Sequence, residues 1–269
     1  MKNLEKLKII LDDEVAKRDT SSELSETDRP DPLIIATKYK DEYISLIASL
    51  FAYGKASLIV KFLQNLDFSI LDKSEKEISQ SLKDKYYRFQ KADDVTAIFI
   101  AIKRLKENNL KIEDTFLEGF NSSNSSENSF KILSAIDNLI LKIENIYKFP
   151  ETQGYRFLLG SRPKLQKLNG NSAYKRWNMF FRWMVRKDNL DLGLWQKVDK
   201  KTLLIPLDTH TFNISRQIGL LDRKTYDFKA VVELTENLKK FDEKDPIKYD
   251  FALYRVGQEK NLETILNKL

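Results

Sequence analysis

Residues 40–54 read KDEYISLIASLFAYG and show the apolar periodicity of a buried helix. Apolar side chains recur at steps of three and four residues, which places them on one helical face: Ile44, Leu46, Ile47, Leu50 and Phe51. Gly54 follows as a residue typical of a helix C-terminus. The stretch therefore predicts a core helix over residues 40–53, and we assign no chemistry to it.

The same helical periodicity dominates the rest of the chain, and strand-like alternation is scarce. Eight glycines and six prolines in 269 residues leave long segments free to be helical. The polar run NSSNSSENS (residues 121–129) predicts a flexible connection. We predict an all-α protein whose further helices include residues 2–18, 56–66, 75–82, 92–106, 112–120 and 129–147.

Composition limits the possible classes of protein. A chain with 42% hydrophobic residues can bury the core of one large domain or of two lobes. The absence of cysteine excludes disulfides, iron–sulfur clusters and thiolate zinc sites, and a single histidine leaves little for an imidazole metal site. The charged N-terminus lacks the apolar core of a signal peptide, and no run approaches 18 apolar residues. We expect a cytoplasmic monomer with no metal, no cofactor and no membrane association.

The net charge of +6 is unevenly distributed. Residues 152–187 contain nine basic side chains and no acidic one, so the remainder of the chain sums to −3. Such a local field is typical of a polyanion-binding site, and nucleic acid is the commonest polyanion partner. The alternative is a solvated, lysine-rich surface. The aromatic residues interleaved with these charges indicate a packed segment rather than a tail.

Residues 168–187, LNGNSAYKRWNMFFRWMVRK, predict a turn followed by a basic helix. Gly170 and Asn171 suit the turn, and Ser172 can cap the helix that follows. Lys175, Arg182 and Arg186 are spaced to share one face, with most of the aromatic residues on the opposite face. Backbone amides at such a helix start can bind a phosphate, which suits a DNA backbone.

Residues 204–212, LIPLDTHTF, contain the only histidine. Pro206 stops the preceding apolar segment, and Asp208 or Thr209 can cap the next helix. The simplest interpretation makes Asp208 a helix cap and His210 a hydrogen-bonded packing residue.

Asp208, Thr209 and His210 also match the Val-Asp-Thr-His context of the catalytic aspartate in helix-hairpin-helix DNA glycosylases, and the stretch resembles that superfamily. The resemblance is closer to DUF2400, an uncharacterised bacterial family of glycosylase-like proteins, and it covers most of residues 30–260. It is carried by four stretches: residues 39–59, 172–195, 204–221 and 245–258.

The resemblance implies a two-lobed helical fold of the helix-hairpin-helix DNA glycosylase (HhH-GPD) type, with a cleft between the lobes. Residues 33–187 would form the central bundle, which ends in a degenerate hairpin and the basic helix. Residues 1–32 and 188–269 would form the second lobe, which carries the Asp-Thr-His motif. Lys175 at the edge of one lobe would face Asp208 at the edge of the other.

This sequence departs from the family pattern at the hairpin. Leu168, Gly170 and Ser172 alone match the usual Leu-Pro-Gly-Val-Gly-like motif. The catalytic lysine of bifunctional members follows that motif, and Lys175 is close to its place. The interval to Asp208 is 33 residues, longer than in the endonuclease III type, and an inserted loop over residues 187–201 could account for it. The archaeal 8-oxoguanine glycosylase branch also has a long interval.

Base excision needs charge stabilisation at the sugar, a nucleophile and access to a flipped base. Asp208 would stabilise the oxocarbenium-like transition state or position the attacking group. Unprotonated Lys175 would attack C1′ and form a Schiff base, which permits strand cleavage. If Lys175 is not the nucleophile, Asp208 could activate water instead. Four aromatic residues could line the base pocket or be simple core: Trp177, Trp183, Trp195 and Phe212.

We therefore expect a base-excision repair glycosylase, with or without AP-lyase activity, that releases a damaged base from duplex DNA in the bacterial nucleoid, with oxidised bases among the candidate lesions. Its expected DNA contacts are Lys167, Gly170, Asn171, Ser172, Arg176, Arg182 and Arg186. Pro206, Thr209 and His210 would be structural, with His210 orienting the turn through a buried hydrogen bond. The alternatives are a non-catalytic nucleic-acid-binding protein on the same scaffold and a helical protein-interaction scaffold.

Overall fold

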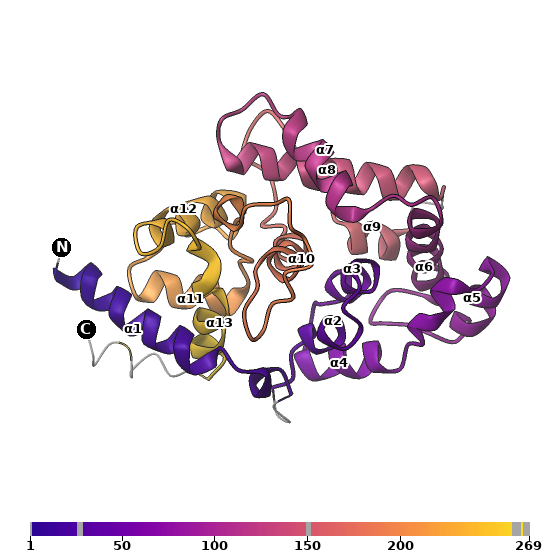
Figure 1. Ribbon diagram of the computed structural model, residues 1–269, viewed down its shortest axis with the longest axis horizontal. Helices are drawn as coiled ribbons and strands as arrows, with labels where there is room; N and C mark the ends of the chain where they lie inside the picture. The colour runs from indigo at the N-terminus through magenta and orange to yellow at the C-terminus, as the bar shows by residue number, and fades with distance from the viewer. Residues whose placement is uncertain (1, 26–28, 149–151, 260–264, 266–269) are drawn as a thin grey trace. The chain divides into compact units, whose positions relative to one another are not determined.

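The computed structural model describes residues 2–25, 29–148, 152–259 and 265. Within these residues the chain forms thirteen α-helices and four 3₁₀ helices (Figure 1). The described residues contain no strand beyond two isolated bridges, Tyr87–Gln90 and Lys187–Leu192. The predicted all-α fold class is confirmed. None of the described helices is both long enough and apolar enough to cross a membrane.

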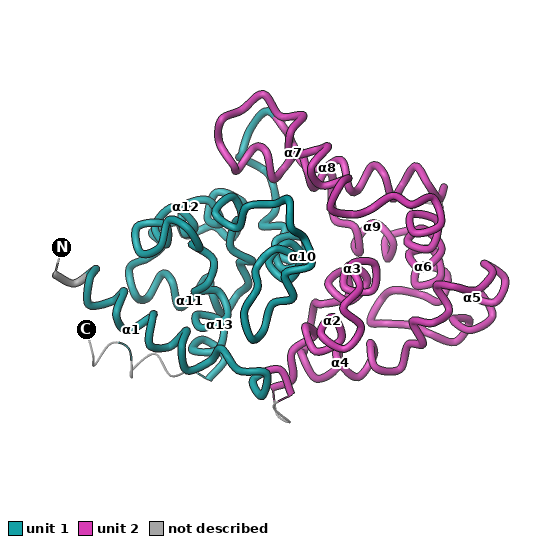
Figure 2. The backbone as a smooth tube through the Cα atoms, viewed as in Figure 1, with its two compact units in different colours: residues 1–23, 166–269 teal, residues 24–165 magenta. Residues whose placement is uncertain are grey.

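The chain divides into two compact units (Figure 2). Residues 24–165 form one unit, and residues 1–23 together with 166–269 form the other. The division lies at residue 165, whereas the resemblance placed it at residue 187. Residues 166–187 belong with the C-terminal part of the chain because ion pairs of Arg182 and Arg186 with Asp250 and Asp245 join them to it.

The unit of residues 24–165 is built around α6 (Ala92–Glu107). This helix packs against four others: α3 (Glu42–Leu50), α5 (Glu75–Leu82), α8 (Asn128–Ile146) and α9 (Gln153–Leu159). Helices α7 (Ile112–Ser122) and α8 pack closely at Gly119, where the absence of a side chain permits the contact. A Cβ atom at this position would lie 2.6 Å from the carbonyl oxygen of Ser134. The helices of this unit other than α6 are α2 (Leu33–Tyr39), α3 (Glu42–Leu50), α4 (Ala56–Gln64), α5 (Glu75–Leu82), α7 (Ile112–Ser122), α8 (Asn128–Ile146) and α9 (Gln153–Leu159), with 3₁₀ helix η2 at Phe68–Asp72.

Side-chain caps set several of these boundaries. Asp41 Oδ1 accepts from the amide of Ile44 at 2.9 Å, so α3 begins at Glu42, two residues after its predicted start. Ser74 and Glu77 form a capping box, and α5 has the predicted bounds. The predicted loop over residues 121–129 is shorter in the structure, since α7 ends at Ser122 and α8 begins at Asn128.

In the unit of residues 1–23 and 166–269, α13 packs against both α1 and α11. Helix α1 has the predicted bounds. The helices of this unit are α1 (Lys2–Arg18), α10 (Lys175–Val185), α11 (Thr209–Gln217), α12 (Phe228–Lys239) and α13 (Asp250–Glu259), with 3₁₀ helices η3 (Lys200–Thr202) and η4 (Pro246–Tyr249). A further 3₁₀ helix, η1, spans Ser21–Leu24.

Candidate active site

Lys175 is the first residue of α10. The helix was predicted to begin at Ser172 with that serine as its cap, and this prediction is wrong. Tyr174 occupies the N-cap position in the left-handed conformation, with φ at 45°, and makes no side-chain cap hydrogen bond. Lys175 is half-buried, and among the described residues no hydrogen bond or salt bridge engages its Nζ atom. Its side-chain nitrogen is therefore available to a ligand.

Asp208 is the N-cap of α11, and its Oδ1 atom accepts from the amide of Thr211 at 2.8 Å. Its position is fixed by the buried segment that precedes it. There the amide of Ile205 donates to Thr235 Oγ1 at 3.1 Å, and Tyr226 Oη donates to the carbonyl oxygen of Leu207 at 2.5 Å. Asp208 is half-buried, and the cap bond engages only one of its two oxygens.

Asp250 links the two predicted catalytic residues electrostatically. It is the first residue of α13 and is 5% exposed. Burial raises the pKa of its carboxyl to about 6. The positive charges of Arg182 and Lys175 oppose this shift, and the negative charge of Asp208 adds to it. Lys175 and Asp208 therefore both lie within electrostatic range of one buried carboxylate, in the same compact unit.

Asp250 was not among the residues predicted for this site. One signal could have identified it, since it is an acidic residue inside the otherwise apolar run Tyr249–Leu253. A buried acid in such a run needs a charged partner. Arg182 supplies it, through an ion pair between Arg182 Nη1 and Asp250 Oδ2.

Arg182 and Arg186 are not surface cations, contrary to the prediction of one basic helix face. Both are buried, at 4% and 8% exposure. Arg182 Nε pairs with Asp191 Oδ1 at 3.1 Å, and Arg186 Nε pairs with Asp245 Oδ1 at 2.9 Å. Their positive charges are neutralised by carboxylates inside the protein, so neither residue belongs to the expected set of nucleic-acid contacts.

The inserted loop supplies part of this network. Asp188 and Asp191 pair with Arg186, at 2.7 Å and 2.5 Å. The loop folds back on α10, because the amide of Trp195 donates to the carbonyl oxygen of Met184 at 2.8 Å. Burial by itself lowers the pKa of Arg186, but the neighbouring carboxylates of Asp191, Asp245 and Asp188 outweigh it and raise that pKa above its ordinary value. The insertion is thus part of the core of this unit.

The four aromatic residues considered for a base pocket are buried in the core. Trp177, Trp183 and Trp195 are at most 3% exposed, and Phe212 is 8% exposed. Phe180 meets Trp195 edge-on at 5.4 Å, and Phe212 meets Tyr226 edge-on at 5.5 Å. These contacts support the other interpretation considered for them, that of packing residues.

The residues of the turn that precedes α10 differ in exposure. Lys167, Gly170 and Ser172 are exposed, and Arg176 is half-buried. Gly170 has a φ of 77°, as its predicted turn requires. Asn171 is buried: its Nδ2 donates to the carbonyl oxygen of Lys167 at 2.8 Å, and its own carbonyl accepts from the amide of Phe228 at 3.1 Å. Asn171 is thus a structural residue that holds this turn against α12.

The residues that flank Asp208 are also distributed between core and surface. Pro206 is buried, and Thr209 is exposed. His210 is exposed as well, with its ring centroid 5.9 Å from that of Tyr254. The predicted buried hydrogen bond of His210 is wrong, because His210 lies exposed on the first turn of α11 with its ring beside that of Tyr254 in α13. In the described residues no group of three or more His, Asp or Glu side chains could hold a metal ion.

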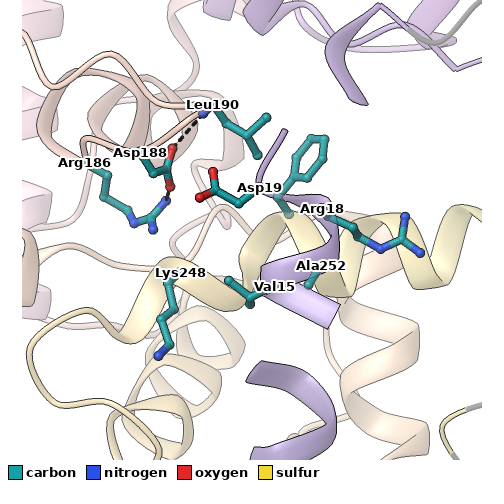
Figure 3. A pocket seen from close by; sticks show the side chains of 9 residues that line it. Val15, Arg18, Asp19, Arg186, Asp188, Leu190, Lys248 and Ala252 are labelled. Carbon is teal, nitrogen blue, oxygen red and sulfur yellow. Dashed lines mark hydrogen bonds and ion pairs between the residues drawn. The ribbon is translucent and has the colours of Figure 1, made fainter. Parts of the chain in front are cut away.

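A small cavity of about 20 Å³ lies in the same unit, where α1, the loop after α10 and α13 come together (Figure 3). Arg18, Asp19, Arg186, Asp188 and Lys248 contribute to its wall. Its cations are engaged by the protein's own carboxylates, for example Arg186 by Asp188 and Lys248 by Asp242 at 2.9 Å. A cavity of this size holds about one water molecule. It is therefore no pocket for a base.

Comparison with known proteins gives one match. The sequence model of a family described as "Protein of unknown function (DUF2400)" matches residues 31–259. No curated protein and no solved structure matches the chain.

Proposed function

The chain belongs to the DUF2400 family, and we propose that it is a DNA glycosylase that uses Lys175 and Asp208 to release a damaged base. The observation that carries this proposal is the common electrostatic environment of the two residues. Each lies at the start of a helix, each is half-buried, and both act on the buried carboxylate of Asp250.

In the proposed reaction the C1′–N bond to the base breaks and a bond from C1′ to Lys175 Nζ forms. The departing base takes the electron pair of the broken bond and the proton that Lys175 Nζ, neutral before the attack, releases once it is bonded to C1′. Asp208, through its charge, stabilises the positive charge that develops on the sugar. The lysine adduct opens to a Schiff base, from which elimination of the 3′ phosphate cleaves the strand. The exposed Lys167 and Ser172 and the half-buried Arg176 are the remaining proposed contacts to the DNA backbone.

Duplex oligonucleotides that carry 8-oxoguanine, uracil, an alkylated base or an abasic site test this proposal, with borohydride present to reduce any Schiff base. We expect at least one lesion to yield a covalent protein–DNA adduct. Lys175→Gln abolishes the adduct, and Lys187→Gln, which removes an exposed lysine just after α10, leaves it unchanged. The proposal fails if no lesion is cut or trapped. Base release without an adduct that requires Asp208 but not Lys175 would instead indicate water as the nucleophile.

A non-catalytic nucleic-acid-binding protein is the second candidate. It is favoured by the cap bond of Asp208 to Thr211, which by itself gives that aspartate a structural role. This candidate predicts salt-dependent DNA binding that Lys167→Gln and Arg176→Gln weaken, with no base released from any of the lesions.

A further inference from the structure

Three aromatic rings meet on the unit of residues 24–165, and we call them the aromatic patch: Tyr53, Phe89 and Phe157. The ring centroid of Phe157 lies 4.7 Å from that of Tyr53 and 4.7 Å from that of Phe89. Tyr53 and Phe89 are 5.9 Å apart. The rings come from three separate segments of the chain: the α3–α4 connection, the turn before α6 and α9.

Polar contacts hold the patch in place. Tyr87 and Gln90 pair across a two-residue turn, at whose tip Arg88 takes the left-handed conformation with φ at 57°. Gln90 is hydrogen-bonded to the hydroxyl of Tyr53, and its Nε2 donates to the carbonyl oxygen of Gly154 at 3.2 Å. Tyr87 Oη donates to the carbonyl oxygen of Tyr53 at 2.6 Å. The rings are thus pre-organised before any partner arrives.

Much of this aromatic surface remains exposed. Phe89 is 43% exposed and Phe157 is 40% exposed, although they touch each other. A contiguous group of exposed aromatic rings on a fixed scaffold is typical of an interaction surface.

The segments that carry the patch are rich in basic residues. The three segments that form it, residues 53–58, 83–91 and 152–159, contain one acidic residue, Asp84, and six basic residues: Lys55, Lys83, Lys85, Arg88, Lys91 and Arg156. The Arg88 guanidinium lies over the ring of Tyr53, with its carbon 5.4 Å from the ring centroid. Exposed rings combined with surrounding cations match the bases and phosphates of a single strand, because every base has a stacking face and every nucleotide a negative charge.

We propose that the aromatic patch binds single-stranded nucleic acid, with unpaired bases stacked on Phe89 and Phe157 and the phosphates held by Arg88 and the neighbouring lysines. The inference does not rest on base excision, since it concerns other residues in the other compact unit. It would hold for an enzyme and for a pure binding protein alike.

Fluorescence anisotropy with the full chain tests the proposal. The probes are a labelled oligothymidylate and a labelled strand of equal length in which every nucleotide is replaced by an abasic analogue. Both probes carry the same phosphates, and only the first can stack. We expect the oligothymidylate to bind about tenfold more tightly at moderate salt. Phe89→Leu, which keeps an apolar side chain but removes the ring, reduces that preference severalfold without lowering the melting temperature. Equal affinity for the two probes, or an unchanged preference in Phe89→Leu, overturns the proposal.

The role of Arg88 has a matched control in Lys40, which is also exposed, basic and left-handed, with φ at 49°. Asparagine tolerates this conformation, so both substitutions to asparagine remove one charge at little conformational cost. We expect Arg88→Asn to weaken binding of the oligothymidylate severalfold and Lys40→Asn to leave it near the wild-type value. If the two substitutions weaken binding equally, binding depends on the net charge of the protein rather than on Arg88, and the proposed site is contradicted. Failure of the wild-type protein to bind either strand would also overturn the proposal and would favour a protein partner for the patch.

Discussion

Asp208 combines a helix cap with a candidate catalytic charge, and one pair of substitutions separates the two roles. Asparagine caps a helix about as well as aspartate but carries no charge. We expect Asp208→Asn to retain wild-type stability in thermal unfolding and to lose base release. Asp208→Ala should lose base release and, in addition, about 1 kcal/mol of stability.

Asp41 provides the control for this experiment, because it caps α3 through the same kind of bond, from Ile44. Asp41→Asn should leave both stability and base release unchanged. If Asp208→Asn retains full activity on every lesion that the wild-type protein cuts, Asp208 is a cap alone and the proposed mechanism is wrong.

Asp250 makes the stability of the protein depend on pH. Its pKa is about 6 in the folded protein against 3.8 ordinarily, so between these values the folded state holds a proton that the unfolded chain has released. Its contribution to stability is therefore full below about pH 4 and falls as the pH rises to 6. The free energy of unfolding of wild type, relative to Asp250→Asn, should decrease by up to about 3 kcal/mol over this window. Denaturant unfolding at successive pH values measures this difference, and a constant or rising difference would contradict it.

At the residue scale, the cap role of Asp208 was easier to predict than the buried partners of Arg182 and Arg186. Asp208 was predicted as a cap from Pro206 and the apolar run before it, which are local signals. Arg182 and Arg186 were misassigned because their partners Asp250 and Asp245 follow 68 and 59 residues later. Helical periodicity does not distinguish a basic surface stripe from arginines that are neutralised by remote acids.

At the scale of elements, the contact between α11 and α13 supports the candidate site, since it carries Asp208 and Asp250. Gly257 permits this contact, because a Cβ atom there would lie 2.9 Å from His210 Cβ and 3.0 Å from Ile214 Cγ1. We expect Gly257→Ala to lower stability by roughly 1–3 kcal/mol through overpacking.

Asn213→Ala, on an exposed position of α11, is the control and should change stability by no more than about 0.5 kcal/mol. Thermal or denaturant unfolding measures both variants. A Gly257→Ala protein as stable as wild type would show that α11 and α13 can separate slightly without loss.

Some helices were predictable from local sequence signals, and others were not. The bounds of α1 and α5 agree with the prediction, since apolar periodicity over α1 and the Ser74–Glu77 capping box at α5 define them locally. Helices α2 and α9 were missed because seven residues make only two turns, which is too few to establish a period. Residues 228–239, which form α12, were also not predicted to be helical.

At the scale of the whole molecule, the basic segment of residues 152–187 has a smaller effective charge than its sequence suggests. Three of its nine cations are neutralised by carboxylates of the protein: Arg162 pairs with Asp137, and Arg182 and Arg186 pair as described. If this segment contacts DNA, six cations at most release counterions. The slope of log K against log salt should then be no steeper than about −5, compared with about −8 for nine cations. Titrations of duplex binding at several salt concentrations measure this slope, and a value near −8 would contradict the neutralisation.

The whole-molecule division was harder to predict than the fold class. Composition and periodicity were enough for an all-α chain. The division at residue 165 follows from ion pairs between α10 and residues 245–250, and such long-range pairs leave no local pattern in a sequence.

The most direct test of the central claim is to identify the residue that borohydride traps on DNA. Peptide mass mapping of the adduct, formed with the lesion that gives the highest yield, locates the cross-link among the lysines of the whole chain. We predict a single modified residue, Lys175, and loss of the adduct in Lys175→Gln. A cross-link at another lysine, or no adduct with any lesion, would contradict the assignment of Lys175 as the nucleophile.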